Sequence, residues 1–162
     1  MKINLKSISI WMKVIIIGFA ICGIAVFGFG LHEIGVSFAE NLGEPYGDYV
    51  LPWEILFWVT AIPCYIVLVI CWLVSNRIKK DLTFSNENAR HFKWISILAG
   101  VDTVIFFVGN FIFLFLNMSH PGIFLVSLVV DFVGFAIAVG AALLSRLISK
   151  AAQLQDEIDL TV

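Results

Sequence analysis

The stretch "IFLVSLVVDFVGFAIAVGAALLS" runs from Ile123 to Ser145 and is almost entirely uncharged. Asp131 is its one charged residue, and the rest is apolar, small or weakly polar. A hydrocarbon core of about 30 Å requires about 20 helical residues at about 1.5 Å each. Lipid offers no water to bond with backbone groups, so a segment of this kind crosses the bilayer as a helix.

Three more stretches have the same character. Val14–Leu31 and Ile55–Asn76 contain no charge, and Trp94–Asn117 contains only Asp102. The 162 residues are 60% hydrophobic and 14% charged, with a mean hydropathy of +1.00, which excludes a soluble domain. The alternation of a membrane β-barrel strand is absent. We predict an all-α integral membrane protein, a single antiparallel four-helix domain with spans at about 10–31, 54–76, 92–117 and 122–147.

Basic residues fall on one side of these four spans. They precede the first span, occupy the connection from Arg77 to Lys93 and follow the last span, whereas the connection Leu31–Glu54 holds acids and no Lys or Arg. The positive-inside rule then predicts cytoplasmic N- and C-termini in a bacterial cell membrane. A signal peptide cleaved after Ser37-Phe38-Ala39, which would leave three spans, is the alternative.

One stripe of small or weakly polar residues on each span predicts which faces pack together. For the first span the stripe is Trp11, Ile15, Gly18, Cys22, Ala25 and Phe29. For the second it is Thr60, Cys64, Val67, Cys71 and Ser75. For the third it is Ser96, Ala99, Thr103, Phe106, Asn110 and Phe113. For the fourth it is Ser127, Asp131, Gly134, Ala138, Ala141 and Ser145.

The intramembrane polar residues Asp102, Asn110 and Asp131 each need an explanation, because a carboxylate at the bilayer centre costs about 2.5–3.5 kcal/mol. The tight turn at Asn117–Gly122 makes the last two spans a hairpin and places Asp131 opposite residue 108. A hydrogen bond from Asn110 to Asp131 is therefore predicted. Asp102 lies off its stripe, so we expect it to face the second helix, a water-filled crevice or another subunit.

The connection before the third span carries a helix-start pattern, with Thr83 or Ser85 as the cap and Glu87 in the first turn. The last helix has no stop signal. Residues 148–162 are predicted to continue it as an amphipathic, acidic cytoplasmic tail, with Leu147, Ala151, Leu154 and Ile158 at helical spacing on one face. This tail is expected to dock on the basic loop or on a protein partner.

Motifs for chemistry are lacking. The three cysteines have no C-x-x-C spacing, the histidines have no metal-ligand spacing, and no nucleophile or phosphate-loop motif occurs. We expect no enzyme activity, no cofactor and no metal. The net charge of −2 gives no basis for direct nucleic-acid binding.

Two stretches carry a resemblance. "TFSNENARHFKWI" resembles a "PF…EN…L" signature, with Thr83 in place of Pro, and "LQDEIDLTV" resembles an "LQEENDLTI" ending. With four spans and this length, the chain is similar to the bacterial domain-of-unknown-function family 2975. That family has no established activity, and its members are often encoded beside a small helix-turn-helix regulator. The resemblance implies a cytoplasmic transcription regulator as partner.

Two hypotheses follow for function. In the first, the chain is a membrane-bound interaction protein that docks a cytoplasmic partner. The residues assigned to docking are Phe84, Glu87, Asn88 and Arg90 in the loop and Leu154, Gln155, Glu157, Asp159 and Leu160 in the tail. In the second, it is a small transporter or an export or immunity component that uses Asp102 and Asp131. The lipid bilayer surrounds it in either case, and a second copy of the chain is a further candidate partner.

Overall fold

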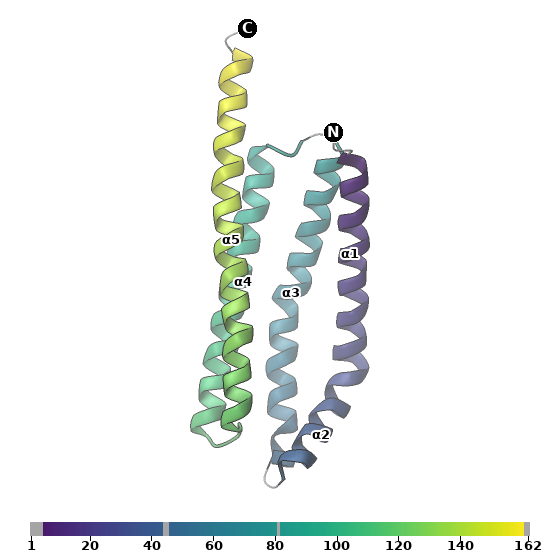
Figure 1. Cartoon of the computed structure of the whole chain (residues 1–162), viewed down its shortest axis with the longest axis vertical. Coiled ribbons are helices and arrows are strands. Elements are labelled where there is room, and N and C mark those ends of the chain that lie inside the picture. The colour runs from purple at the N-terminus through teal and green to yellow at the C-terminus, as the bar shows by residue number, and fades with distance from the viewer. Residues whose placement is uncertain (1–4, 44–45, 81, 161–162) are drawn as a thin grey trace.

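The computed structural model describes residues 5–43, 46–80 and 82–160, and all its elements are helical (Figure 1). Within these ranges, the side chains of Leu42, Tyr46, Asp156, Asp159 and Leu160 lie outside the description. The elements are α1 (Leu5–Ala25), the π-helical η1 (Val26–Gly30), α2 (Leu31–Leu42), the 3₁₀-helical η2 (Tyr46–Tyr49), α3 (Val50–Lys79), α4 (Asn86–Phe115) and α5 (Pro121–Leu160).

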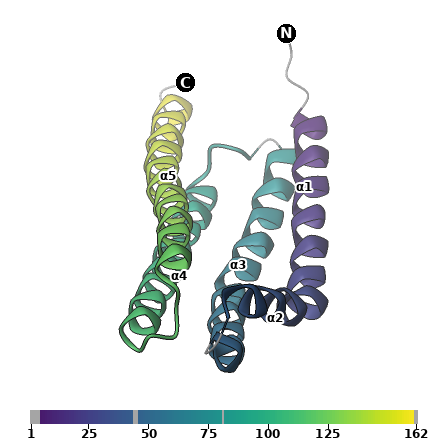
Figure 2. The same cartoon turned by 60° about the horizontal axis from the view of Figure 1, so that its bottom comes forward.

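Four helical segments are long and apolar enough to cross a membrane, which confirms the four predicted spans. They are Leu5–Asn41, Gly47–Lys79, Asn86–Phe115 and Pro121–Gln155. The first is longer than a bilayer requires and changes direction at η1, so that α2 runs across the end of the molecule towards α3 (Figure 2). A π turn widens the backbone spiral, and such turns are a recognised cause of helix bends.

The four long helices form an open row. α1 packs on α3, α3 on α4 and α4 on α5, and no comparable contact joins α1 to α5 in the described part of the chain. In both views α1 and α5 lie at opposite sides of the molecule. The all-helical, antiparallel bundle of four long helices agrees with the prediction, and its helices are arranged in a row. α4 and α5 make the most extensive interface.

The seam between α4 and α5 follows the two predicted stripes. Thr103 lies so close to Gly134 that a Cβ on the glycine would overlap the threonine Oγ1. Near the other end of the seam, Ser145 Oγ donates a hydrogen bond to the backbone oxygen of Ala89 at 2.7 Å. Small residues allow this approach of the backbones, which is how membrane helices gain packing energy. The buried residues of the α5 stripe include Ser127, Asp131, Ala138 and Ala141.

The predicted contact stripe of the first span is wrong. Its members are exposed, with Trp11 at 67% and Phe29 at 81%. The contact with α3 instead uses Ser9, whose hydroxyl donates to the backbone oxygen of Ser75 at 2.8 Å while Ser75 Oγ donates to the backbone oxygen of Ser9 at 3.0 Å. Both serines are fully buried, so this reciprocal pair fixes α1 against the end of α3.

The stripe predicted for the second span is correct only in part. Thr60 and Ser75 are buried, but Cys64 is exposed. A helix in the middle of a row needs two contact faces, and a single stripe cannot describe it. Towards α4, Leu56 fills the space that a side chain at Gly109 would need, since a Cβ there would lie 2.6 Å from Leu56 Cδ1. Towards α1, the Tyr65 hydroxyl donates to the backbone oxygen of Ala20 at 3.3 Å.

α5 continues well beyond the other helices. It has 40 residues and ends at Leu160, which confirms that the last helix runs on past its span. Because Ser145 bonds to Ala89 near the start of α4, the residues of α5 after about position 148 extend past α4. Figure 1 shows this extension above the remaining helices.

Substituting Gly134 by Ala should lower the free energy of unfolding by about 1–3 kcal/mol, because the added methyl group overlaps Thr103 in a packed seam. Gly140→Ala on the same helix is the matched control, since nothing lies within 4 Å of the Cβ that it adds. Unfolding of the purified protein in graded SDS measures both. Equal stability of the two variants would contradict the close packing of this seam.

Candidate functional site

Both chain termini and the connection between α3 and α4 lie at one end of the molecule, which we call the basic end (Figure 1). The Lys and Arg residues that the structure describes all belong to segments at this end. They are Lys6, Lys13, Arg77, Lys79, Lys80, Arg90, Lys93, Arg146 and Lys150. This gathering of positive charge agrees with the sequence pattern and makes the basic end the first candidate for recognition.

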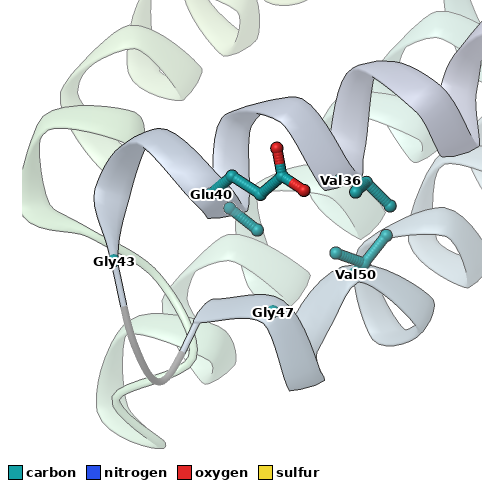
Figure 3. Close-up of a pocket in the computed structure, with 6 residues that line it drawn as sticks. Val36, Glu40, Gly43, Gly47 and Val50 are labelled. Atoms are coloured by element: carbon teal, nitrogen blue, oxygen red, sulfur yellow. The ribbon is translucent and has the colours of Figure 1, made fainter.

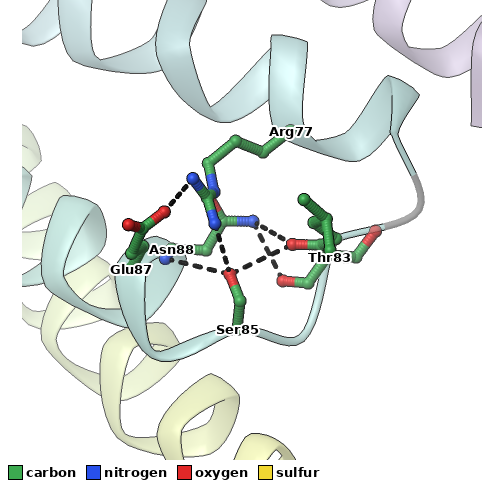
Figure 4. A network of polar contacts seen from close by, with 6 residues as sticks. Arg77, Thr83, Ser85, Glu87 and Asn88 are labelled. Atoms are coloured by element: carbon green, nitrogen blue, oxygen red, sulfur yellow. Dashed lines mark hydrogen bonds and ion pairs between the residues drawn. The ribbon is translucent and has the colours of Figure 1, made fainter.

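The connection at the basic end is built around Asn88, which is 1% exposed. Ser85 is the N-cap of α4, as predicted, and its Oγ accepts a hydrogen bond from the Asn88 backbone N–H at 3.3 Å. The Asn88 side-chain amide donates to the backbone oxygens of Leu82 and Thr83 at 2.9 and 3.0 Å. Asn88 therefore holds the connection onto the first turn of α4 (Figure 4).

An ion pair adds a second link across the connection. Arg77 in the last turn of α3 pairs with Glu87 in the first turn of α4. The same guanidinium approaches Ser85 Oγ at 3.5 Å, as Figure 4 shows. Residues 82–85 of the connection are thus bonded to the end of α3 and to the start of α4.

Of the residues that were assigned to docking in the loop, two are bonded within the loop and two are accessible. Asn88 is buried and bonded within the connection, and Glu87 is paired with Arg77, so both structure the loop. Direct contact of Asn88 with a partner therefore stays a prediction, and the burial of the Asn88 side chain disfavours it. Phe84, at 57% exposure, and the exposed Arg90 remain accessible.

The tail of α5 presents an apolar stripe to the surroundings. Leu147, Leu154 and Ile158 are 63%, 61% and 62% exposed, whereas the buried residues of this part of the helix, Ile148 and Ala152, lie on a different face. The loop does not cover the stripe in the described part of the chain. Gln155 and Glu157 are exposed, and the assigned side chains of Asp159 and Leu160 lie outside the described residues.

Asp102 faces the neighbouring helix α3, one of the three surroundings expected for it. The Cys64 thiol donates to Asp102 Oδ2 at 3.4 Å, while Asp102 Oδ1 is buried without a hydrogen-bond partner. No partner for Cys64 could be predicted, because a cysteine inside a span has no distinguishing pattern. The thiol–carboxyl contact lies in the interface between α3 and α4.

The predicted hydrogen bond between Asn110 and Asp131 does not form. Asn110 Nδ2 donates to the backbone oxygen of Phe106 in its own helix at 2.8 Å, and neither oxygen of Asp131 has a hydrogen-bond partner in the described chain. Both residues are nonetheless buried, Asn110 at 1% and Asp131 at 8% exposure. Asp102 and Asp131 therefore occupy different helix interfaces, and the structure offers no direct link for a relay between them.

The end opposite the basic end contains contacts that the sequence did not reveal. His32 Nδ1 and Glu54 Oε1 lie 2.6 Å apart, and Trp53 Nε1 donates to the Met118 backbone oxygen at 3.2 Å. Between α2 and the start of α3 is a hollow of about 420 Å³, on whose rim the Glu40 carboxylate lies (Figure 3). No three His, Cys, Asp or Glu side chains gather as metal ligands within the described ranges.

Replacing Asn88 by Ala should lower the free energy of unfolding by about 1–3 kcal/mol, because the buried amide no longer donates to the backbone oxygens of Leu82 and Thr83, of which the Leu82 oxygen keeps the hydrogen bond from Ser85 Oγ. The connection should also become a site of rapid proteolysis. Asn86→Ala, at an exposed position two residues away, is the control and should leave both properties unchanged. Limited proteolysis of membranes followed by mass spectrometry measures the effect. Equal cleavage of the two variants would contradict the role of Asn88.

Comparisons with known proteins agree with this architecture. Residues 34–162 match the profile of a family described as "Protein of unknown function (DUF2975)". The chain is also 34% identical over 110 residues to the "Uncharacterized membrane protein YoaS" of Bacillus subtilis (strain 168). The matched region covers 67% of this chain and 69% of that protein. No solved structure matches the chain. The family match spans three of the four long helices and both distinctive stretches of the basic end, and the protein is a multi-pass membrane protein that belongs to the DUF2975 family.

Proposed function

We propose that the protein is a non-enzymatic docking platform of the cell membrane that recruits a soluble cytoplasmic protein to its basic end. The observation that carries the proposal is the projecting tail of α5 with its exposed apolar stripe. The gathering of basic residues at the same end supports a cytoplasmic location for it, because cytoplasmic flanks of membrane helices are enriched in Lys and Arg.

The length of α5 supports a tail that stands clear of the bilayer. Leu154 lies 33 residues after Pro121, the first residue of the helix, which corresponds to about 50 Å. A bilayer including its headgroups is about 40–45 Å thick. With the start of α5 at one membrane surface, Leu154 and Ile158 stand in water beyond the other. Large apolar side chains four residues apart on an exposed helix face are typical of helices that bind in the groove of a partner.

Two further features favour a protein over the membrane surface as the occupant of this stripe. α5 is one continuous helix, so the tail cannot lie flat on the lipid without a break in it. The tail also carries Asp156, Glu157 and Asp159, which an anionic leaflet repels. The ordered loop beside it presents Phe84 and Arg90 as additional contacts. The family resemblance implies a small helix-turn-helix regulator as the partner.

The double substitution Leu154→Gln and Ile158→Gln should weaken binding of such a regulator by at least about a hundredfold, since each buried aliphatic side chain contributes about 1.5–3 kcal/mol. Glutamine keeps the helix propensity of the tail. Binding of the purified regulator to the detergent-solubilised protein is measured by surface plasmon resonance. Gln153→Ala, on another face of the tail, should bind like the native chain. Unchanged affinity of the double variant would refute the docking role of the stripe.

Labelling of bacterial cells that express the protein tests on which side of the membrane the basic end lies. A cysteine at Gln153 should react with an impermeant maleimide only after the membrane is opened, whereas one at Asp48 should react in intact cells. The native chain, whose three cysteines lie in α1 and α3, is the control. Labelling of the Gln153 position in intact cells would place the basic end outside and remove the proposal.

A further inference from the structure

A groove of about 290 Å³ lies between α4 and α5. Asp131 lies on its wall together with three phenylalanines, Phe107, Phe132 and Phe135. Asp131 is ten residues from Pro121, so it lies about 15 Å from that end of α5, near the middle of a bilayer. The three rings are 40%, 72% and 60% exposed, which means that the groove opens sideways to lipid.

The carboxyl group of Asp131 has no hydrogen-bond partner among the described residues. The residue is 8% exposed, and neither carboxyl oxygen makes a hydrogen bond with the described residues. The sequence has no Lys or Arg between Ile95 and Ser145, so neither helix of the hairpin can supply a cation at this depth. An unpaired carboxylate at the bilayer centre costs about 2.5–3.5 kcal/mol, and a bound cation offsets that cost.

The surroundings of the carboxyl group select the kind of cation. Phenyl rings attract an ammonium group through their quadrupole and also cover an apolar body. A lone carboxyl does not make a site for a divalent metal, which needs several oxygen ligands. A volume near 300 Å³ matches the lower limit of small-molecule pockets, so the ligand is small.

We propose that this groove binds a small lipophilic ammonium compound that enters from the bilayer, with Asp131 as the counter-ion and the phenyl rings around its apolar body. Both carboxyl oxygens are buried in the unliganded chain, so the proposed binding includes a change of the Asp131 rotamer that brings them to the ammonium N–H groups. The site is independent of the docking tail, which lies at the other end of α5.

Asp102 provides a matched comparison. It is also an intramembrane carboxylate on this hairpin, but it accepts a hydrogen bond from Cys64 and is not part of the groove wall. A general effect of negative charge in the membrane would involve both acids, whereas a specific site involves Asp131 alone.

The test uses the purified full-length chain in a neutral detergent, titrated with 4-phenylbutylamine and, separately, with the uncharged 4-phenylbutanol. Calorimetry should show saturable binding of the amine to the native chain and to Asp102→Asn. Asp131→Asn should bind it at least tenfold more weakly, and so should the native chain with the alcohol. Loss of an unpaired buried acid should not impair folding, and the melting temperature of Asp131→Asn checks this.

A second pair of variants shows whether amine binding depends on the phenyl rings of the groove or on any exposed phenyl ring of the hairpin. Phe132→Ala should weaken amine binding several-fold, while Phe115→Ala, at a 76% exposed position outside the groove, should not. Three results would each overturn the proposal. They are equal amine affinity of Asp131→Asn and the native chain, equal affinity for alcohol and amine, and no amine binding to the native chain, in which case the carboxyl holds only a proton.

Discussion

The close approach of α4 and α5 sets the register of the most extensive helix interface in the described chain. Apolar surface gives no driving force between helices in lipid, so association depends on packing at short range and on a few polar contacts. Here small residues provide the short range. Gly134 lies against Thr103, and a Cβ on Gly100 would lie 3.9 Å from that of Ala138, in ordinary contact. This seam sets the register that places Asp131 in its groove and projects the tail beyond α4.

The long helices and the α4–α5 seam could be predicted from the sequence because each depends on local information. Span length and the positions of charge predict four crossings, and the spacing of Gly134, Ala138 and Ala141 predicts one face of α5. The stripe on α1 could not be assigned in this way. Gly18, Cys22 and Ala25 have the right spacing, but so do Ser9, Ala20 and Gly23, and only the position of α3 decides between the two faces. An edge helix in an open row has a single neighbour, and the composition of the helix does not say where that neighbour lies.

Among the polar residues, too, local contacts could be predicted from the sequence and contacts between distant residues could not. The cap at Ser85 was predictable because it depends on residues three positions apart. The pairing of Asn110 with Asp131 depended on the register of the hairpin, which a short turn can shift. Since Gly134 lies against Thr103, Asp131 is level with residue 106 instead of 108, and Asn110 bonds to its own backbone. Asn88 looked like a surface residue by type, yet its amide satisfies carbonyls of the preceding connection, which no periodicity reveals.

Cross-linking across the α4–α5 seam tests the account most directly. Cysteines at Gly100 and Ala138, in a chain whose native cysteines are replaced by Ala, should form a disulfide rapidly, since the Cβ separation of 3.9 Å falls within the usual range of about 3.5–4.5 Å. A protease site inserted in the turn between α4 and α5 reports the bond, because cross-linked fragments stay together on a denaturing gel. We expect fast cross-linking of this pair and slow cross-linking of Gly100 with the exposed Val139. Equal rates for the two pairs, or faster cross-linking at Val139, would contradict the register on which the groove and the projecting tail depend.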